Sequence, residues 1–509
     1  MSSGRVVLVG AGPGDPGLLT LRAAQVLAHA DVLLYDALAS DPIVALAPPS
    51  CERIYVGKRA GDHAMPQEEI EALMVERARK GNVVVRLKGG DPYVFGRGGE
   101  EAMALHEAAI PFEIVPGVSS AIAAPAYAGI PVTHRDFNAA FTVATGHEDP
   151  TLRPAWGEGR LDWSKLADPD RTLVLLMAMG NLAGICERLA EHGLRPDTPV
   201  AVIQDGTRPT QRTVTGTLAT IAGEAERAGL EAPAIVVVGR AVSLRERLRW
   251  YDRMPLFGKR VLITRPARQA ADFARVLFAR GVEPILASTI AIAPPDDPVP
   301  AHRAIDALAA YRWLVFTSQN GVDAFFERLA ALDCDARYLG GTKVAAIGAK
   351  TAQRLRERGI RPEVVPQAFV GEEIARALVE GSREGDRMLI YRAQEARDVL
   401  PQMLEDANRK PHVVAAYKTV FQTDPQFAQK VAYADVLTFT SSSTVRGFSV
   451  AFEGDAAASE AARGKLVACI GPIAAQTAAE IGLKVDVTAD VFTTDGLLDA
   501  LEAHFARRA

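Results

Sequence analysis

The chain has 509 residues, of which 48% are hydrophobic and 23% are charged. At roughly 150 residues per domain, this length predicts about three or four domains with ordinary hydrophobic cores. The 57 lysine and arginine residues are balanced by 62 aspartate and glutamate residues, a formal net charge of −5 that argues against a nucleic-acid-binding protein. The four cysteines lie far apart with no C-x-x-C spacing, so we expect neither a disulfide framework nor a metal site.

The start of the chain and its apolar stretches bear on where the protein works. The first residues lack the anatomy of a signal peptide. The longest uncharged stretch lies between Glu113 and Arg135, and its proline and glycine residues are too many for a membrane-spanning helix. We therefore expect a cytoplasmic protein with no membrane segment and no nucleic-acid partner.

Short β-branched runs alternate with longer segments rich in alanine, leucine and arginine along almost the whole chain. In the first half, such runs occupy residues 6–10, 31–36, 82–90, 171–177, 199–206 and 234–242, with helical patterns at 18–30 and 68–80. This alternation predicts the α/β fold class, with largely parallel sheets.

Two breaks in composition divide the chain. A basic stretch at 245–260 contains Pro255 and Gly258 and precedes a new strand-like run. It predicts one unit at 1–248, a linker at 249–258 and a second unit at 259–509, and the arginines of the basic stretch are expected to face solvent. A segment rich in Asp, Pro, Gly and Trp, residues 147–171, is interpreted as a connection inside the first unit, between sub-domains at about 1–136 and 137–248.

The second unit contains a duplication. The tripeptide FTS occurs at 316–318 and again at 439–441, and Ile347-Gly348 recurs as Ile470-Gly471, in both cases with an offset of 123 residues. The opening runs at 261–265 and 388–392 match at an offset of 127. We expect two similar α/β units that face each other across a ligand-binding cleft.

A first glycine-rich motif, GAGPGDPG at 10–17, follows a strand and precedes a helix. Its glycines at 12, 14 and 17, with Asp36 at the end of the next strand, satisfy a dinucleotide fingerprint. Pro13 and Pro16, however, remove two backbone donors that could face a pyrophosphate. This motif alone leaves a nucleotide, another adenosyl ligand and a structural turn as open alternatives.

A second motif, RLKGGDPYVFGRGGEE at 86–101, is more informative. It has five glycines between charged residues and directly follows a strand, and ligands of open α/β sheets lie at the carboxyl ends of the strands. Arg97 can present a planar fork to a carboxylate, and Glu100 lies beside it. The pattern of a P-loop is absent from the sequence.

Seven motifs in this order and spacing strongly resemble uroporphyrinogen-III C-methyltransferases of the tetrapyrrole-methylase family. The resemblance covers about residues 4–245 and rests on VGAGPGDPGLLTLRA, YDALAS, VGKRAG, RLKGGDPYVFGRGGEE, VPGVSSA, GIPVTHR and QDGTRPTQRTVTGTL. It implies a two-domain fold with S-adenosylmethionine (SAM) bound between the domains. It also implies transfer of two methyl groups, to C2 and C7 of uroporphyrinogen III, giving precorrin-2 for sirohaem or cobalamin synthesis.

The resemblance also implies site residues. Matched to the family's motifs, the cofactor contacts are Pro13, Gly89, Gly90, Asp91, Val94, Ser119, Ser120, Met177 and Gly206. Met179 is an alternative to Met177, and Ser119-Ser120 departs from the Thr-Ala that the family often has.

The family's acid/base pair falls on Asp36 as proton acceptor and Lys58 as proton donor. Arg97 is either a substrate anchor or the base. Because the substrate carries carboxylates around its rim, we expect Arg97, Arg135, Lys58 and His147 to anchor it. Glu100, beside Arg97, is also expected at the substrate site. For Asp36 and Lys58 the alternatives are a turn cap and a surface lysine.

In the second unit, hydroxyl-bearing residues follow the strands, and no Ser/His/Asp arrangement, metal cluster or phosphate loop is visible in the sequence. These hydroxyls either bind carboxylates at helix N-termini or cap the helices. The residues singled out are Thr317, Ser318, Thr440, Ser441 and Ser442.

Four stretches of this unit, over about 259–505, resemble uroporphyrinogen-III synthase. They are VLITRPARQAADFARVL, FTSQNGVDAFF, VVAAYKTV and IGPIAAQTAAEIGLKVDVTADVFTTDGLLDAL. The resemblance implies a two-domain fold in which residues 259–293 join 419–509 and residues 294–418 form the other domain, so that the repeats exchange their opening units. It implies cofactor-free closure of hydroxymethylbilane with inversion of ring D. Tyr417 matches the family tyrosine proposed to assist hydroxyl departure, with a packed aromatic as the alternative. Ala474 stands where the family often has threonine.

Together, the resemblances predict a bifunctional enzyme that joins an N-terminal two-domain tetrapyrrole-methylase fold to a C-terminal two-domain uroporphyrinogen-III synthase fold. We expect it to form a homodimer through its methyltransferase half. Two alternatives stay open: a non-catalytic tetrapyrrole-binding second half, and an NAD-dependent oxidoreductase in the first half.

Overall fold

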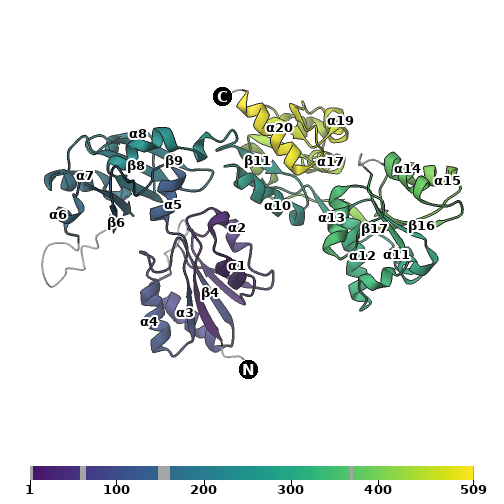
Figure 1. Cartoon of the computed structure of the whole chain (residues 1–509), viewed down its shortest axis with the longest axis horizontal. Coiled ribbons are helices and arrows are strands. Elements are labelled where there is room, and N and C mark those ends of the chain that lie inside the picture. Colours follow the sequence, from purple (N-terminus) through teal and green to yellow (C-terminus); the bar gives the residue numbers. More distant parts are fainter. Residues whose placement is uncertain (1–3, 58–64, 147–160, 367–370, 508–509) are drawn as a thin grey trace.

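The computed structural model describes residues 4–57, 65–146, 161–366 and 371–507, which form four five-stranded sheets. Each sheet and its helices make one lobe (Figure 1). We number them so that the first and second lobes belong to the first half of the chain. The third lobe holds the C-terminus, and the fourth is the remaining lobe.

The first lobe has a parallel sheet in the order β3-β2-β4-β1-β5. Its strands are β1 (Arg5–Gly10), β2 (Val32–Tyr35), β3 (Glu52–Tyr55), β4 (Val83–Lys88) and β5 (Phe112–Val115). Its helices are α1 (Leu21–Leu27), α2 (Asp41–Val44), α3 (Gln67–Arg79) and α4 (Gly98–Glu107). Helix α5 (Ser120–Tyr127) follows β5 in the chain but packs on the sheet of the second lobe. Strand β1 is apolar without alternation because both faces of the sheet are covered.

The second lobe has a mixed sheet in the order β6-β7-β10-β8-β9. Its strands are β6 (Ala140–Thr145), β7 (Arg171–Leu176), β8 (Pro199–Gln204), β9 (Arg212–Thr217) and β10 (Ala234–Val238), and its helices are α6 (Trp163–Leu166), α7 (Leu182–Glu191), α8 (Ile221–Arg227) and α9 (Arg245–Leu248). Only β6 and β7 run parallel. The prediction of largely parallel sheets is therefore wrong for this lobe. The segment between β8 and β9 is too short for a parallel crossover and makes a hairpin.

The third lobe has a parallel sheet in the order β12-β11-β18-β19-β20. Its strands are β11 (Arg260–Ile263), β12 (Glu283–Leu286), β18 (Val436–Phe439), β19 (Leu466–Cys469) and β20 (Val487–Thr488). Its helices are α10 (Ala267–Phe278), α16 (Phe427–Tyr433), α17 (Ser442–Ala451), α18 (Asp455–Ala461), α19 (Pro472–Glu480) and α20 (Thr494–Ala506).

The fourth lobe has the strand order β13-β17-β16-β14-β15. Its strands are β13 (Ile290–Ala293), β14 (Trp313–Phe316), β15 (Lys343–Ala346), β16 (Arg387–Ala393) and β17 (Lys410–Phe421), and its helices are α11 (Val299–Asp306), α12 (Gln319–Ala331), α13 (Ala349–Glu357), α14 (Gly371–Gly381) and α15 (Val399–Asp406). Strand β13 pairs antiparallel with β17. Residues 290–293, which we expected with the first segment, therefore lie in this sheet, and β13 and β17 are the strands that lead between the two lobes.

The duplicated repeats exchange their opening strands. Strand β11 opens the first repeat but pairs with β18 of the second, with Leu262 opposite Leu437. Strand β16 opens the second repeat but pairs with β14 of the first, with Leu389 opposite Leu314. Each of these two lobes is thus built from both repeats.

The junction between the two halves is packed. Tyr251 is 2% exposed, its ring lies edge-on to Tyr127 and Phe257, and its hydroxyl donates to the Thr207 carbonyl. Arg245 is buried as well and pairs with Asp252. The expectation that the arginines of this stretch face solvent is therefore wrong for Arg245, because the segment folds against α5.

No helix in the described ranges is long and apolar enough to span a membrane. All four cysteines are free thiols.

Candidate active site

The two glycine-rich motifs of the first lobe bind each other through their backbones. Gly12 N–H donates to the Gly90 carbonyl at 3.1 Å, and Gly90 N–H donates to the Gly12 carbonyl at 2.7 Å. Both residues have positive φ values, 74° and 66°, which glycine adopts without strain. A Cβ on Gly10 would lie 2.5 Å from the backbone nitrogen of Gly117. These glycines therefore let three loops meet at the carboxyl edge of the sheet.

Asp91 fixes these loops to one another. Its Oδ1 accepts from Tyr93 N–H at 2.8 Å, and its Oδ2 accepts from Gly117 N–H at 3.0 Å. Ser119 caps α5 by accepting from Ala121 N–H at 3.3 Å. The loop after β4 and the N-terminus of α5 are consequently held as one unit.

The second lobe covers this edge from the other side. Within the second lobe, Gly206 packs so closely on α5 that a Cβ would lie 2.3 Å from the Ala124 Cβ. Arg208 reaches across to the first lobe and donates to the Leu38 carbonyl at 3.1 Å. The loop at Asp15 is also tied across, because Asp15 N–H donates to Thr207 Oγ1 at 3.1 Å and Tyr127 donates to Asp15 Oδ2 at 2.6 Å.

A cavity of about 600 Å³ lies between the first and second lobes. All nine cofactor contacts implied by the resemblance line it, together with Asp36, Arg97 and the alternative Met179. Its wall also includes residues to which the sequence analysis gave no role: Gln67, Arg86, Lys88, Phe95, Asp205 and Arg208.

Backbone strain is concentrated at this cavity. Four of its lining residues are not glycine yet have positive φ: Phe95 (54°), Arg97 (58°), Met177 (55°) and Asp205 (50°). Such conformations cost on the order of 1–3 kcal/mol each and cluster at functional sites. Met177 is also 52% exposed, so it is a cavity residue and not part of the core.

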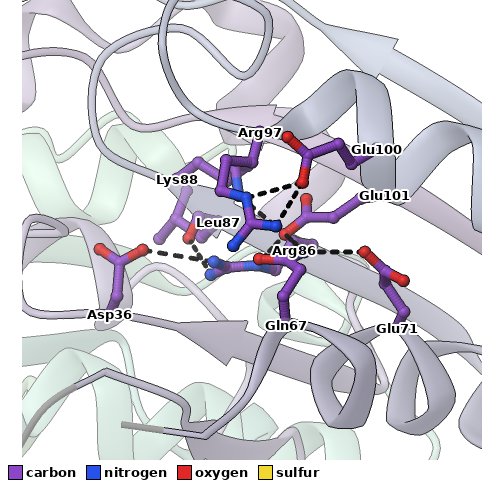
Figure 2. Close-up of polar contacts among 9 residues, drawn as sticks. All are labelled: Asp36, Gln67, Glu71, Arg86, Leu87, Lys88, Arg97, Glu100 and Glu101. Atoms are coloured by element: carbon purple, nitrogen blue, oxygen red, sulfur yellow. Dashed lines mark hydrogen bonds and ion pairs between the residues drawn. The ribbon is translucent and has the colours of Figure 1, made fainter. Parts of the chain in front are cut away.

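A buried charge cluster borders the cavity, as Figure 2 shows. Glu101 Oε1 accepts from Lys88 Nζ at 2.8 Å and from Arg86 Nε at 3.2 Å. Burial, followed by the nearby Arg86 charge, lowers the pKa of Lys88. The sequence signal for this cluster is the spacing of 86 and 88, which puts two cations on one face of a buried strand.

Asp36 lies at the carboxyl end of β2 beside this cluster. Its Oδ2 is 3.4 Å from Arg86 Nη2, and its Oδ1 accepts from Leu38 N–H at 3.1 Å. The second contact is the turn cap that we considered as the alternative. Asp36 therefore both caps its turn and lines the cavity.

Arg97 lies at the mouth of the cavity, with a side chain that is 57% exposed. It pairs with Glu100, and this hydrogen bond raises the pKa of Arg97. Both residues also line a second hollow of about 500 Å³ beside α3. Arg135 is exposed and does not line the cavity. Lys58 and His147 lie outside the described residues.

In the second half, the hydroxyl groups singled out from the sequence follow β14 and β18. Ser318 Oγ accepts from Gly321 N–H at 3.1 Å, and Ser441 Oγ accepts from Thr444 N–H at 3.2 Å. Both serines are thus helix caps, the alternative considered above. Thr317 and Thr440 directly precede them, and Ser442 Oγ accepts from Thr477 Oγ1 at 2.8 Å.

Tyr417 joins this group, because its hydroxyl donates to Ser318 Oγ at 2.9 Å. The third and fourth lobes also touch through the first turns of four helices, α10 and α20 of the third lobe and α12 and α13 of the fourth. Gln269 Nε2 donates to Asn320 Oδ1, and Lys350 Nζ donates to Thr494 Oγ1, each at 2.9 Å. Ala474 is buried in the core of the third lobe.

These two halves match known families. Residues 5–222 match the family model described as tetrapyrrole (corrin/porphyrin) methylases, and residues 271–499 match that of uroporphyrinogen-III synthase HemD. The porphyrin biosynthesis protein HemD of Ruminiclostridium josui is 37% identical over 98% of both chains. The uroporphyrinogen-III C-methyltransferase of Bacillus subtilis (strain 168) is 40% identical over 78% of this chain and 80% of its own. The Thermus thermophilus uroporphyrin-III C-methyl transferase complexed with S-adenyl homocysteine is 40% identical, with a TM-score of 0.40, over 47% of this chain and 100% of its own.

The fold and the cavity define a two-part protein of α/β architecture whose first half has a ligand site between two lobes. With its two family matches and a relative similar over nearly its whole length, the chain belongs to the family that joins a tetrapyrrole methylase to a uroporphyrinogen-III synthase.

Proposed function

We propose that the chain is a bifunctional enzyme of tetrapyrrole biosynthesis. Its second half closes hydroxymethylbilane to uroporphyrinogen III with inversion of ring D. Its first half then transfers two methyl groups from SAM to C2 and C7, giving precorrin-2. The observation that carries the proposal is the cavity between the first two lobes, which gathers the nine residues matched to the family's cofactor contacts.

The residues of this cavity fit SAM. A volume of about 600 Å³ lies within the roughly 300–1,000 Å³ of small-molecule sites. Gly89 and Gly90 leave backbone open at its edge, and Val94 and Met177 offer apolar surface. Asp91 is the nearest match for a polar anchor, although both its oxygens already accept backbone hydrogen bonds. When bound, the cofactor supplies an electrophilic methyl group.

The chain's contribution to methyl transfer is chiefly alignment, because a methyl group must meet an electron-rich pyrrole carbon at the right angle. The substrate's carboxylates would bind Arg97 at the cavity mouth, with Glu100 holding the guanidinium in place. Asp36, whose carboxylate lines the cavity, would accept the proton that leaves the macrocycle. Lys58 as proton donor, and Arg135 and His147 as substrate contacts, remain predictions.

The synthase half is proposed to work without a cofactor. It would hold the flexible substrate in a conformation that favours closure with inversion of ring D over spontaneous cyclisation. Tyr417 would assist departure of the hydroxyl group. Carboxylates of the substrate would bind at the N-termini of α12 and α17, where helix ends favour negative charge. The hydroxyl groups there belong to Thr317, Ser318, Thr440, Ser441 and Ser442.

A coupled assay of the whole chain tests the proposal. The chain is given hydroxymethylbilane and methyl-labelled SAM, and dimethylated product is expected. The same reaction without SAM should give uroporphyrinogen III. If uroporphyrinogen I predominates instead, the second half binds tetrapyrroles without catalysing the closure. Thermal stabilisation by NADH, and not by S-adenosylhomocysteine (SAH), would instead favour an oxidoreductase.

The assembly and the cell compartment are proposed as well. We expect a homodimer through the methyltransferase half. Light scattering coupled to size-exclusion chromatography would then give twice the 54.4 kDa mass of the chain. Fractionation would test the expectation that the protein works in the cytoplasm.

A further inference from the structure

Glu101 is a carboxylate in an unusual place. It is 0% exposed, and it lies behind the cavity wall and not among the lining residues. Its Oε1 accepts from Lys88, Arg86 and, at 3.3 Å, Gln67 Nε2, while its buried Oε2 has no hydrogen-bond partner among the described residues. Burying a carboxylate is costly unless it is paired. Its presence on α4 therefore calls for a role that an apolar residue could not fill.

Arg86 connects Glu101 with the cavity. Its Nε donates to Glu101 Oε1, its Nη1 donates to the Leu87 carbonyl at 3.0 Å, and its Nη2 lies 3.4 Å from Asp36 Oδ2 (Figure 2). The planar guanidinium is thereby held at three corners. Since Asp36 Oδ1 accepts from Leu38 N–H, Arg86 leaves that carboxylate little freedom to turn. The orientation of Asp36 thus depends, through Arg86, on Glu101, which does not line the cavity.

The cluster is also balanced in charge. Arg86 and Lys88 both line the cavity, and their two formal positive charges are matched by Glu101 and Asp36. Without Glu101, the cluster would carry an excess positive charge. Such an excess would repel a cationic sulfonium donor far more than a neutral thioether, because charges interact strongly where water is excluded.

We propose that Glu101 is a positioning residue of the methyl-transfer site, which orients Asp36 through Arg86 and cancels the excess positive charge beside the cationic methyl donor. The inference rests on the proposed function of the first half. Glu101 would thereby affect both the binding of SAM and the orientation of Asp36, although it contacts neither of them.

The charge effect is tested by binding to the full chain. In Glu101→Gln, the ratio of the Kd for SAM to the Kd for SAH should rise about fivefold near neutral pH. The rise should shrink at alkaline pH. Lys88 is faced by Arg86, Glu101 and Asp36, and its pKa, already lowered, falls further when Glu101 no longer raises it. Glu113→Gln, which removes a carboxylate paired with Arg22 on the surface, is the matched control and should leave the ratio unchanged.

The orientation effect is tested by a double-mutant cycle on methyl transfer. Glu101→Gln should lower kcat about 100-fold, the cost of a misplaced catalytic group. Combined with Asp36→Asn, it should cost no more than Asp36→Asn alone, because the two residues act as one unit. If Glu101→Gln yields no folded protein, Arg86→Lys replaces it in the cycle, since lysine keeps the charge but loses the fork.

The inference is overturned if the Kd ratio of Glu101→Gln equals that of the control, or if the losses in kcat multiply in the double variant. A wild-type chain that binds SAM but does not methylate uroporphyrinogen III would count against the proposed function instead. In that case the Kd ratio still tests the charge effect.

Discussion

The hydroxyl of Tyr417 donates to Ser318 Oγ at 2.9 Å, which joins strand β17 to the N-cap of helix α12. Tyr417 is 8% exposed, so its ring is part of the core while its hydroxyl meets the start of a helix. Ser318 already caps that helix through Gly321 N–H. A phenolic proton is therefore held at a helix terminus that favours anions.

Replacing Tyr417 by phenylalanine should keep the packing of the ring and remove the donor. We expect formation of uroporphyrinogen III from hydroxymethylbilane to slow about 10- to 100-fold, because an acid for the departing hydroxyl is lost. Tyr311→Phe is the matched control. Tyr311 is a buried tyrosine of the same lobe, bonded to His412 at the opposite end of β14. Equal rates in the two variants would remove Tyr417 from the reaction.

Replacing Arg97 by alanine should spare cofactor binding and abolish methylation. The side chain lies at the cavity mouth, where it pairs with Glu100 and is 57% exposed. We expect the Kd for SAH to change less than about threefold and methyl transfer to fall at least about 100-fold. Arg195→Ala, which removes a more exposed arginine that is likewise paired with a carboxylate, Asp197, should leave both unchanged. Retained turnover in Arg97→Ala would place the substrate elsewhere.

Gly206 should tolerate no side chain. A Cβ there would lie 2.3 Å from the Ala124 Cβ and 3.0 Å from its Cα, so α5 would have to move together with Ser119 and Ser120 at its start. Gly206→Ala should destabilise the fold by about 1–3 kcal/mol and weaken SAH binding in calorimetry. Gly223→Ala, inside α8 with open space around it, should instead stabilise by about 0.5–1 kcal/mol. Unchanged SAH binding in Gly206→Ala would contradict the coupling of the cofactor site to the packing of Gly206 on α5.

The four thiols should differ sharply in reactivity. Burial raises the pKa of Cys469 to about 12 and that of Cys186 to about 11, while Cys334 is only half-buried. Alkylation of the native chain at mildly alkaline pH should therefore modify one thiol per chain, identified by mass spectrometry as Cys334. Modification of Cys469 in the native chain at the same rate would refute this.

The same burial of Cys469 predicts a pH dependence of stability. Its thiol loses a proton near its ordinary pKa of 9.0 when the chain is unfolded, but near 12 when it is folded. In that window the folded state binds more protons, so the free energy of unfolding should fall as pH rises. Thermal unfolding of Cys469→Ala should show a shallower decline above about pH 9 than the wild-type chain. A parallel decline would assign the effect to other groups.

Much of this architecture could be predicted because it depends on local sequence patterns. The offset of 123 residues between the FTS motifs matches β14 and β18, which occupy equivalent positions in their sheets. The glycine-rich loops were predicted to meet a ligand at the carboxyl edge of the sheet, and the cavity lies there. Residues whose family roles were matched by position, such as Gly89 and Met177, come together because the backbone of those loops is distinctive.

What could not be predicted depends on partners distant in the sequence. The charges of Glu101, Arg86 and Lys88 can be read from the sequence. Their pairing, however, requires α4 to pack on β4. Arg245 was predicted to face solvent because a run of arginines is usually hydrated. Its burial depends on Asp252 and on the Ala128 carbonyl, which only the folded chain brings to it. The course of β13 depends in the same way on β17.

The exchange of opening strands also determines when the second half of the chain can fold during synthesis. Arg260 at the start of β11 bonds Asp435, a partner 175 residues further along the chain. A nascent polypeptide leaving the ribosome must therefore carry an uncovered strand edge until nearly the whole protein has been translated. A gene cut between the two repeats would encode fragments that each lack a neighbour for a central strand, and these fragments could regain a complete architecture only by assembling with one another.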